Sequence, residues 1–234
     1  QLWREESLWD CEVRVEGRAF RAHRVVLAAR ASFMKSACTV GLAETSTASV
    51  ALEEMEAAVF EAVLEFVYAS TCTFGELLAL EVLRAASRLG IKPLEAEVVA
   101  HVTKTVDPPS CLSVWRAGDV LTLPPLVEAA TKCAAESFAA VAATDAFLAG
   151  DAPWLESLLA SDDLAVDAEE QVFDALKRWH AAQRPPPAQE ALNRLLALVR
   201  WPLLAQGFVA EHVNTDPMVA SHAGVLVVLK AMQD

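Results

Sequence analysis

The chain has 234 residues, of which 54% are hydrophobic, a content too high for an intrinsically disordered chain. Its formal net charge of −13 argues against broad binding to DNA, RNA or anionic lipid, because these attract positively charged proteins. The strongest aliphatic run covers only residues 225–229, far short of the roughly 20 residues that span a bilayer. We therefore expect no nucleic-acid partner and no membrane partner.

The cysteines indicate the compartment of the protein. They are odd in number and widely spaced: Cys11, Cys38, Cys72, Cys111 and Cys133. This pattern is typical of a reduced intracellular chain and not of a disulfide framework. The chain starts at Gln1 without a signal peptide or an initiator methionine, which favours a fragment of a longer protein.

The first fifty residues predict a small sheet with two helices. Apolar Cys11, Val13 and Val15 alternate with charged residues, the period-two pattern of a half-buried strand. The turn after this strand is expected at Gly17 and Arg18. The other elements predicted here are a strand over residues 19–22, helices over residues 24–31 and 33–39, and a strand over residues 49–52.

After the third strand the sequence becomes almost wholly helical. One buried helical face is predicted by apolar residues spaced at i, i+3, i+4 and i+7, namely Phe60, Val63, Leu64 and Val67. The next helix, over residues 78–89, is expected to end at Gly90, because glycine is common just after a helix. Another helix is predicted over residues 94–105.

Two adjacent prolines, Pro108 and Pro109, mark the predicted domain boundary, because proline cannot continue a helix. The two domains are expected to cover residues 1–106 and 107–234. The helices predicted in the second domain cover residues 111–122, 125–143, 154–160, 169–182 and 189–200.

The helix over residues 169–182 carries a clear predicted start signal. Asp167 is expected at the N-cap position, with Glu170 closing a capping box. Asp162 and Asp163 are expected to cap a helix and not to act as an acid–base pair. The predicted buried stripe of the helix consists of Val172, Phe173, Leu176, Trp179 and His180.

The sequence contains no pattern that predicts catalysis. Its cysteines and histidines lack the close spacing of metal ligands, and it has no glycine-rich phosphate loop and no nucleophile elbow. His23 is expected to fix a strand-to-helix corner near Asp10, in preference to a catalytic role, and Cys72 to be an ordinary half-buried residue and not a redox sensor. We predict no enzyme, no cofactor and no metal.

The stretch from Asp10 to Glu44 resembles the opening of a BTB domain. The resemblance lies in the order of its parts, which are Asp10 at the head of a strand, Gly17 at the turn, residues 20–24 as the second strand, residues 26–29 at the start of a helix, and Gly41, Leu42, Ala43 and Glu44 at the end.

The second half of the chain resembles a BACK domain. The matching parts are residues 161–166, the helix with Glu170, Val172, Phe173 and Trp179, residues 198–204, and residues 216–219. BACK domains follow BTB domains in Kelch-like proteins, which are adaptors for cullin-3 ubiquitin ligases. The resemblance implies an α+β, mostly helical fold. A BTB/POZ domain with a small sheet flanked by helices precedes an all-α BACK domain of stacked helix pairs.

The same resemblance implies a function. The chain is expected to be a non-catalytic scaffold that dimerises through its BTB domain and binds cullin-3 through BTB and the first BACK helices. A ubiquitylation substrate would bind through a C-terminal module absent from this chain. The expected compartment is the cytoplasm, with the nucleus as an additional alternative. The alternative is a BTB–BACK scaffold that self-associates for cytoskeletal or transcriptional partners without binding cullin.

Two sets of site residues follow from the resemblance by position. The residues implied for the homodimer interface are Leu2, Trp3, Leu8, Trp9, Val25, Val26, Ala28 and Ala29. Those implied for cullin binding are Phe33, Met34, Lys35, Ala37, Leu42, Glu44, Tyr68, Leu112, Val114 and Trp115. The sequence departs from the family pattern at Ala37 and Cys38, where many relatives carry a Met-Phe pair, and at Ser110, where asparagine is common.

Overall fold

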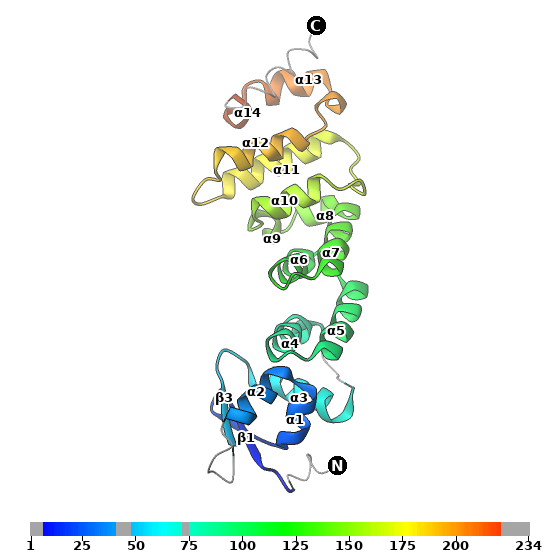
Figure 1. The fold of residues 1–234 in the computed structure, drawn as a ribbon. Helices are drawn as coiled ribbons and strands as arrows, with labels where there is room; N and C mark the ends of the chain where they lie inside the picture. The colour runs from blue at the N-terminus through cyan, green and yellow to red at the C-terminus, as the bar shows by residue number, and fades with distance from the viewer. Residues whose placement is uncertain (1–6, 41–47, 72–74, 221–234) are drawn as a thin grey trace. The chain divides into compact units, whose positions relative to one another are not determined.

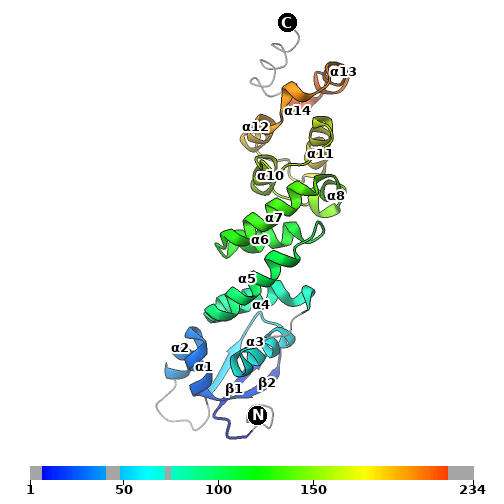
Figure 2. The same ribbon diagram turned by 90° about the vertical axis from the view of Figure 1, so that its right-hand side faces the viewer.

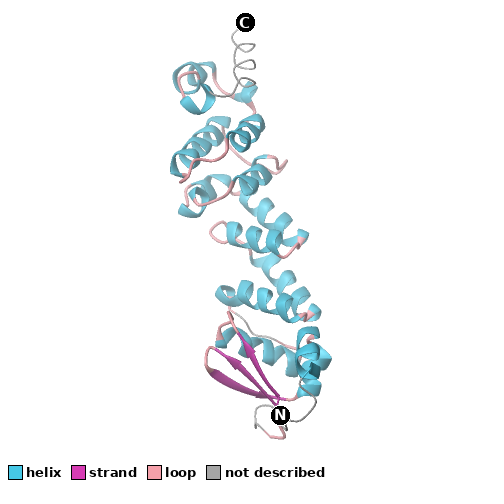
Figure 3. Cartoon of the chain, turned by 60° about the vertical axis from the view of Figure 1, so that its left-hand side comes forward, coloured by secondary structure: helices cyan, strands magenta, loops and turns pink. Residues whose placement is uncertain are grey.

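The computed structural model describes residues 7–40, 48–71 and 75–220, and no described helix is long and apolar enough to cross a membrane. The contacts divide the chain into two compact units, Gln1–Thr105 and Val106–Asp234 (Figure 1). The predicted boundary after residue 106 lies one residue from this division. The first unit combines a sheet with helices, and the described part of the second is helical (Figure 3).

The sheet of the first unit has three strands, β1 (Cys11–Val15), β2 (Arg18–Ala22) and β3 (Ala48–Leu52), in the order β2-β1-β3. Strand β1 pairs antiparallel with β2 and parallel with β3, so that Val13 lies opposite both Phe20 and Val50. The predicted alternation is confirmed, because the three apolar residues of β1 are completely buried.

The turn between β1 and β2 is formed by Glu16 and Gly17, one residue earlier than predicted. Both residues have positive φ angles, 48° and 76°. A two-residue turn of this kind matches the right-handed twist of the two strands. Arg18 is therefore the first residue of β2, where it pairs with Val15.

Five helices complete the first unit within the described residues: α1 (Arg24–Arg30), α2 (Ser32–Val40), α3 (Ala57–Ala69), α4 (Glu76–Leu89) and α5 (Lys92–Thr105). The four apolar residues predicted to form one face of α3 are all buried. Helix α4 ends at Gly90 as predicted, with a φ angle of 70° there and the Ile91 N–H donating to the carbonyl of Ala86.

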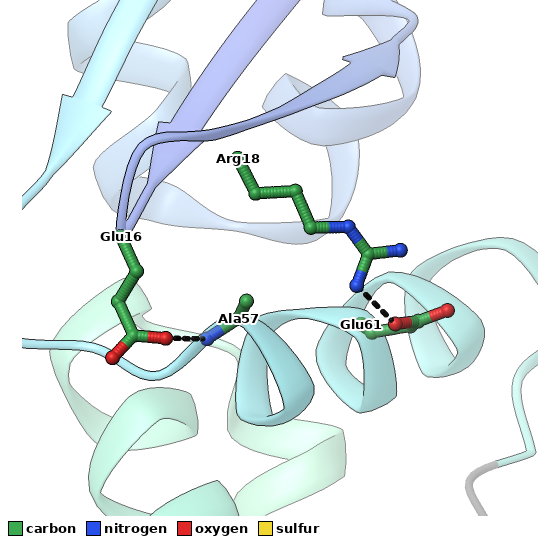
Figure 4. A network of polar contacts seen from close by, with 4 residues as sticks. All are labelled: Glu16, Arg18, Ala57 and Glu61. Carbon is green, nitrogen blue, oxygen red and sulfur yellow. Dashed lines mark hydrogen bonds and ion pairs between the residues drawn. The ribbon is translucent and has the colours of Figure 1, made fainter.

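The tip of the hairpin binds the beginning of α3 (Figure 4). The carboxylate of Glu16 accepts the backbone N–H of Ala57 at 2.9 Å, and the N-cap residue Glu56 makes no side-chain bond of its own. One turn further on, the Arg18 guanidinium pairs with Glu61 at 2.9 Å. Side chains from the sheet therefore cap the helix and fix its direction.

The second unit is a succession of helices (Figure 2). Its larger described helices are α6 (Cys111–Val120), α7 (Pro124–Glu136), α10 (Ala152–Leu159), α11 (Glu169–Ala182) and α12 (Gln189–Leu198). The shorter ones are α8 (Phe138–Ala142), α9 (Asp145–Leu148), η1 (Trp201–Leu203), α13 (Gln206–Phe208), η2 (Val209–Val213) and α14 (Pro217–Ala220).

The single helix predicted over residues 125–143 is wrong, because the backbone leaves the helical region at Ser137. The φ and ψ angles of this residue are −116° and 31°, and α7 and α8 lie on either side of it. Helix α9 was also not predicted. It is capped by Thr144, whose hydroxyl accepts the N–H of Phe147 at 3.1 Å.

The predicted capping box of α11 is also wrong. The helix begins at Glu169, and its N-cap residue Ala168 has no side-chain acceptor. Glu169 accepts the backbone N–H of Arg200 at 2.8 Å, and Glu170 accepts that of Ala205 at 2.9 Å. These carboxylates are held by a loop about 30 residues away in sequence, which a local capping pattern cannot reveal.

Two smaller expectations for this region need correction. Asp162 and Asp163 are exposed and cap none of the described helices, since α11 begins only at Glu169. In the predicted stripe of α11 the first four residues are buried, but His180 near its end is only half-buried.

Candidate protein-interaction surfaces

An open groove of about 380 Å³ lies between α1 and α3. Its lining residues are Val25, Val26, Ala29, Arg30, Val67 and Tyr68. Leu27 of α1 is buried in the core. The other apolar residues of this short helix lie on its opposite, outer face. Val25 is 74% exposed, Val26 and Ala28 are half-buried, and Ala29 is exposed.

Tyr68, the only tyrosine of the chain, joins this groove to the segment before β1. The Tyr68 hydroxyl accepts the backbone N–H of His23 at 2.8 Å and lies 2.9 Å from its Nδ1. His23 Nε2 lies 3.0 Å from the carbonyl of Ser7, an oxygen that can only accept. In the neutral imidazole the proton therefore lies on Nε2, so that Nδ1 accepts the tyrosine O–H. Burial raises the pKa of Tyr68, and the nearby Asp10 carboxylate adds to the rise.

The expected structural role of His23 is borne out by this network. Asp10 belongs to the same corner, because its carboxylate accepts the backbone N–H of Arg24 at 2.7 Å and so caps the start of α1. The segment before β1 is thereby attached to both α1 and α3.

Four residues of this segment were predicted to contact a second subunit, and the structure describes two of them, Leu8 and Trp9. Leu8 is 81% exposed and adopts a positive φ angle of 58°, which is unusual for a side chain of this size. Trp9 is half-buried, with the Arg21 guanidinium 5.0 Å from its ring centroid. Leu2 and Trp3 lie outside the described residues.

The residues predicted to bind cullin on α2 differ in exposure. Phe33 is 42% exposed and Lys35 is exposed, but Met34 is 1% exposed and belongs to the core. Ala37 belongs to the part of α2 whose side chains are not described, and Leu42 and Glu44 lie outside the described residues. Tyr68 is half-buried in the groove between α1 and α3, beside residues predicted for the dimer.

The residues predicted to bind cullin on α6 are buried. Leu112, Val114 and Trp115 are at most 5% exposed, so their side chains form part of the core of the second unit. A signal for this was present in the sequence, because Cys111, Val114, Trp115 and Gly118 follow the i, i+3, i+4, i+7 spacing of one buried face.

Helix α7 packs closely against that face. A Cβ atom at Gly118 would lie only 2.9 Å from the Cβ of Leu126, so that glycine is what permits the approach. The apolar surface that α6 offers lies at its end instead, where Val120 is 79% exposed. Our sequence reasoning did not identify this residue.

The thiols near the start of the second unit are not activated. The Cys111 Sγ donates to the carbonyl of Pro108 at 3.1 Å, and burial raises the pKa of this thiol to about 11. Burial also raises the pKa of Cys133. Among the described residues, no three His, Cys, Asp or Glu side chains are grouped to hold a metal ion.

Comparisons with known proteins identify the domain family of each of the two units. The family model of the BTB/POZ domain matches residues 1–105, and that of the domain described as BTB And C-terminal Kelch (BACK) matches residues 111–214. The chain thus consists of a BTB/POZ domain followed by a BACK domain. These two domains, together with the similarity to Kelch-like proteins over most of the chain, confirm the resemblance and the fold class predicted from sequence.

Several curated Kelch-like proteins are similar to this chain. Kelch-like protein 7 of Rattus norvegicus is 31% identical over 216 residues, covering 92% of this chain and 37% of the relative. Kelch-like protein 40 of Mus musculus is 33% identical over 229 residues, covering 96% of this chain and 36% of the relative. The chain thus spans little more than a third of these relatives. A solved structure, the BTB domain of zebrafish PATZ1, is 20% identical with a TM-score of 0.40, covering 44% of this chain and 84% of that one.

Proposed function

We propose that this chain is the dimerising and cullin-binding part of a cullin-3 ubiquitin ligase adaptor. The observation that carries the proposal is a BTB domain followed directly by a BACK domain, as in Kelch-like proteins, whose general role is that of an adaptor. The chain itself would catalyse no reaction. The substrate would be selected by a module outside this chain, in the cytoplasm and also in the nucleus.

Dimerisation is proposed through the N-terminal segment and α1. Leu8 and Val25 are among the most exposed large apolar side chains of the described residues, and the groove between α1 and α3 continues this surface. A second copy would cover these apolar groups symmetrically. The expected interface buries about 1,200–2,000 Å² in total.

Cullin binding is proposed around α2 and the segment that follows it. Phe33 supplies an exposed aromatic side chain and Lys35 a charge beside it. Leu42 and Glu44, outside the described residues, are the proposed apolar anchor and polar partner. The buried residues Met34, Leu112, Val114 and Trp115 would then act by shaping the helices, and not by touching the cullin.

A double variant of Leu42 and Glu44 tests this proposal. Leu42→Asp combined with Glu44→Ala should abolish binding to the N-terminal region of cullin-3, measured by calorimetry, because it removes both anchors. The control pair Leu203→Asp with Glu190→Ala makes the same chemical changes at exposed positions of the BACK domain and should bind like wild type. Equal affinities of wild type and the Leu42/Glu44 variant would show that cullin binds elsewhere.

A self-associating scaffold without cullin is the second candidate function. It is favoured by the burial of four predicted contact residues and by the small side chains at Ala37 and Cys38. A dimeric wild type that shows no heat of binding with cullin-3 would establish this alternative.

A further inference from the structure

A second groove, of about 830 Å³, opens in the BTB domain beside the end of β3. The start of α3 and one face of α4 form its walls, and the tip of the β1–β2 hairpin borders it. Leu52, Met55, Val59 and Ala85 make its floor apolar. It contains none of the residues assigned above to the dimer or to cullin, so neither proposed partner accounts for it.

The cations that line this groove are already engaged. Arg14 pairs with Glu12 at 2.7 Å, and Arg84 forms an ion pair with Glu81. Arg88 donates to the backbone carbonyl of Glu53. Each of these three guanidinium groups therefore already has a partner within the domain, which reduces the positive charge that the groove presents to a ligand.

Several of the carboxylates at the groove are not engaged. Glu16 is held by the N–H of Ala57, as described above, but Glu53, Glu54 and Glu56 are exposed. None of these three carboxylates forms an ion pair or hydrogen bond within the described residues. The rim therefore presents three adjacent negative charges above an apolar floor.

The backbone around this rim is held in an unusual conformation. Glu54 has a positive φ angle of 56°, a strained choice for a residue with a long side chain. The bond from Arg88 fixes the peptide just before it to α4. The three carboxylates are thus displayed by a fixed turn.

Strand β3 leads directly into the groove, because Ala51 and Leu52 at its end also line it. In the described sheet β3 is an outer strand, with β1 as its neighbour on one side. It carries no charged residue and no proline of the kind that commonly protects an exposed sheet edge. An extended segment added to this edge would continue over the apolar floor.

We propose that this groove binds a basic, extended segment of a partner protein. The segment pairs its backbone with β3, places apolar side chains on the floor and directs Lys or Arg side chains to Glu53, Glu54 and Glu56. The proposal is independent of cullin binding and of dimerisation.

A pair of short peptides tests the chemistry of the groove. A fluorescent Lys-Val-Lys-Val-Lys peptide should bind the full chain in an anisotropy titration, because its lysines meet the acidic rim while its valines face the floor. The matched Glu-Val-Glu-Val-Glu peptide should not bind. Binding of both peptides, or of neither, would overturn the proposal.

Charge variants then locate the binding site. Glu53→Gln, Glu54→Gln and Glu56→Gln together should weaken the lysine peptide about tenfold, the combined effect expected of three exposed ion pairs. The control Glu97→Gln, Glu128→Gln and Glu190→Gln removes the same charge at exposed sites away from the groove and should change affinity little. If both triple variants weaken binding of the lysine peptide equally, the peptide is attracted to the acidic protein in general. The groove would then be rejected as its binding site.

A steric variant provides a check that does not depend on removing charge. Ala51→Arg places a long cation at an exposed position of the groove and should abolish peptide binding while leaving the thermal unfolding transition in place. Unchanged binding by a folded Ala51→Arg variant would also contradict the proposal.

Discussion

At the scale of single residues, the hydrogen-bond network of His23 and Tyr68 connects three parts of the BTB domain. Tyr68 belongs to α3, His23 precedes α1, and Ser7 lies before β1. Each hydrogen bond in this network has a defined donor, because the backbone groups at its two ends fix the imidazole tautomer. Losing the hydroxyl would leave two polar groups of His23 without this partner.

Tyr68→Phe should therefore lower the free energy of unfolding by about 1 kcal/mol, a modest value because the network is only partly buried. Urea unfolding followed by circular dichroism measures the change. Thr105→Val, which removes an exposed hydroxyl bonded within its own helix, serves as the control and should have little effect. Equal stability of wild type and Tyr68→Phe would contradict a structural role for this hydroxyl.

At the scale of elements, two glutamates at the start of α11 hold the segment after α12. Glu169 is buried and Glu170 half-buried, and each accepts one backbone N–H from residues 200–205. The bond from Ala205 lowers the pKa of Glu170, since it stabilises the charged carboxylate. A group whose pKa is lower in the folded state stabilises the fold above its ordinary pKa, and this contribution is lost as the pH falls through the folded value.

The free energy of unfolding should consequently decrease as the pH falls below about 4.3, the ordinary pKa of a glutamate. In Glu170→Gln the free energy of unfolding should decrease less over this pH range than in wild type, because an amide does not take up the proton. Chemical unfolding at a series of pH values tests the difference. Glu190→Gln, which removes an exposed carboxylate from α12, should retain the wild-type profile. Identical pH profiles for Glu170→Gln and wild type would refute this contribution.

At the scale of the whole molecule, the distribution of exposed apolar side chains is the basis for the proposed dimer. Within the described residues the exposed large hydrophobic side chains include Leu8 and Val25 in the BTB domain and Val120 and Leu203 in the BACK domain. The pair in the BTB domain lies on segments joined by the His23–Tyr68 network, and Val25 borders the groove between α1 and α3. Because Leu8 and Val25 lie on one continuous surface, we propose that the dimer interface includes these two residues.

Light scattering after size exclusion should therefore give twice the chain mass of 25.2 kDa for the wild type. Leu8→Glu with Val25→Glu should give a single chain mass, because four carboxylates would face one another in the dimer. The control Leu203→Glu with Val120→Glu makes the same substitutions on the BACK domain and should remain dimeric. A monomeric wild type, or equal behaviour of the two pairs, would refute the assignment.

Much of the fold follows from local patterns in the sequence. The alternation in β1, the apolar face of α3 and the end of α4 at Gly90 were all predicted, because each depends on residues within one or two turns of each other. The BTB and BACK domains were identified by resemblance, over residues 10–44 and over parts of residues 161–219. A periodic pattern predicts that a side chain faces the interior, and this prediction does not depend on which residues it packs against.

Other features were decided only by tertiary structure. Met34 and Trp115 were expected at a partner surface, but their side chains are buried in the folded chain. Glu170 was expected to cap its own helix, yet its carboxylate accepts the N–H of Ala205, 35 positions away. The acidic groove likewise combines a hairpin, a strand end and two helices. Sequence spacing carries no information about such distant neighbours, and burial and hydrogen bonding depend on which neighbours the fold supplies.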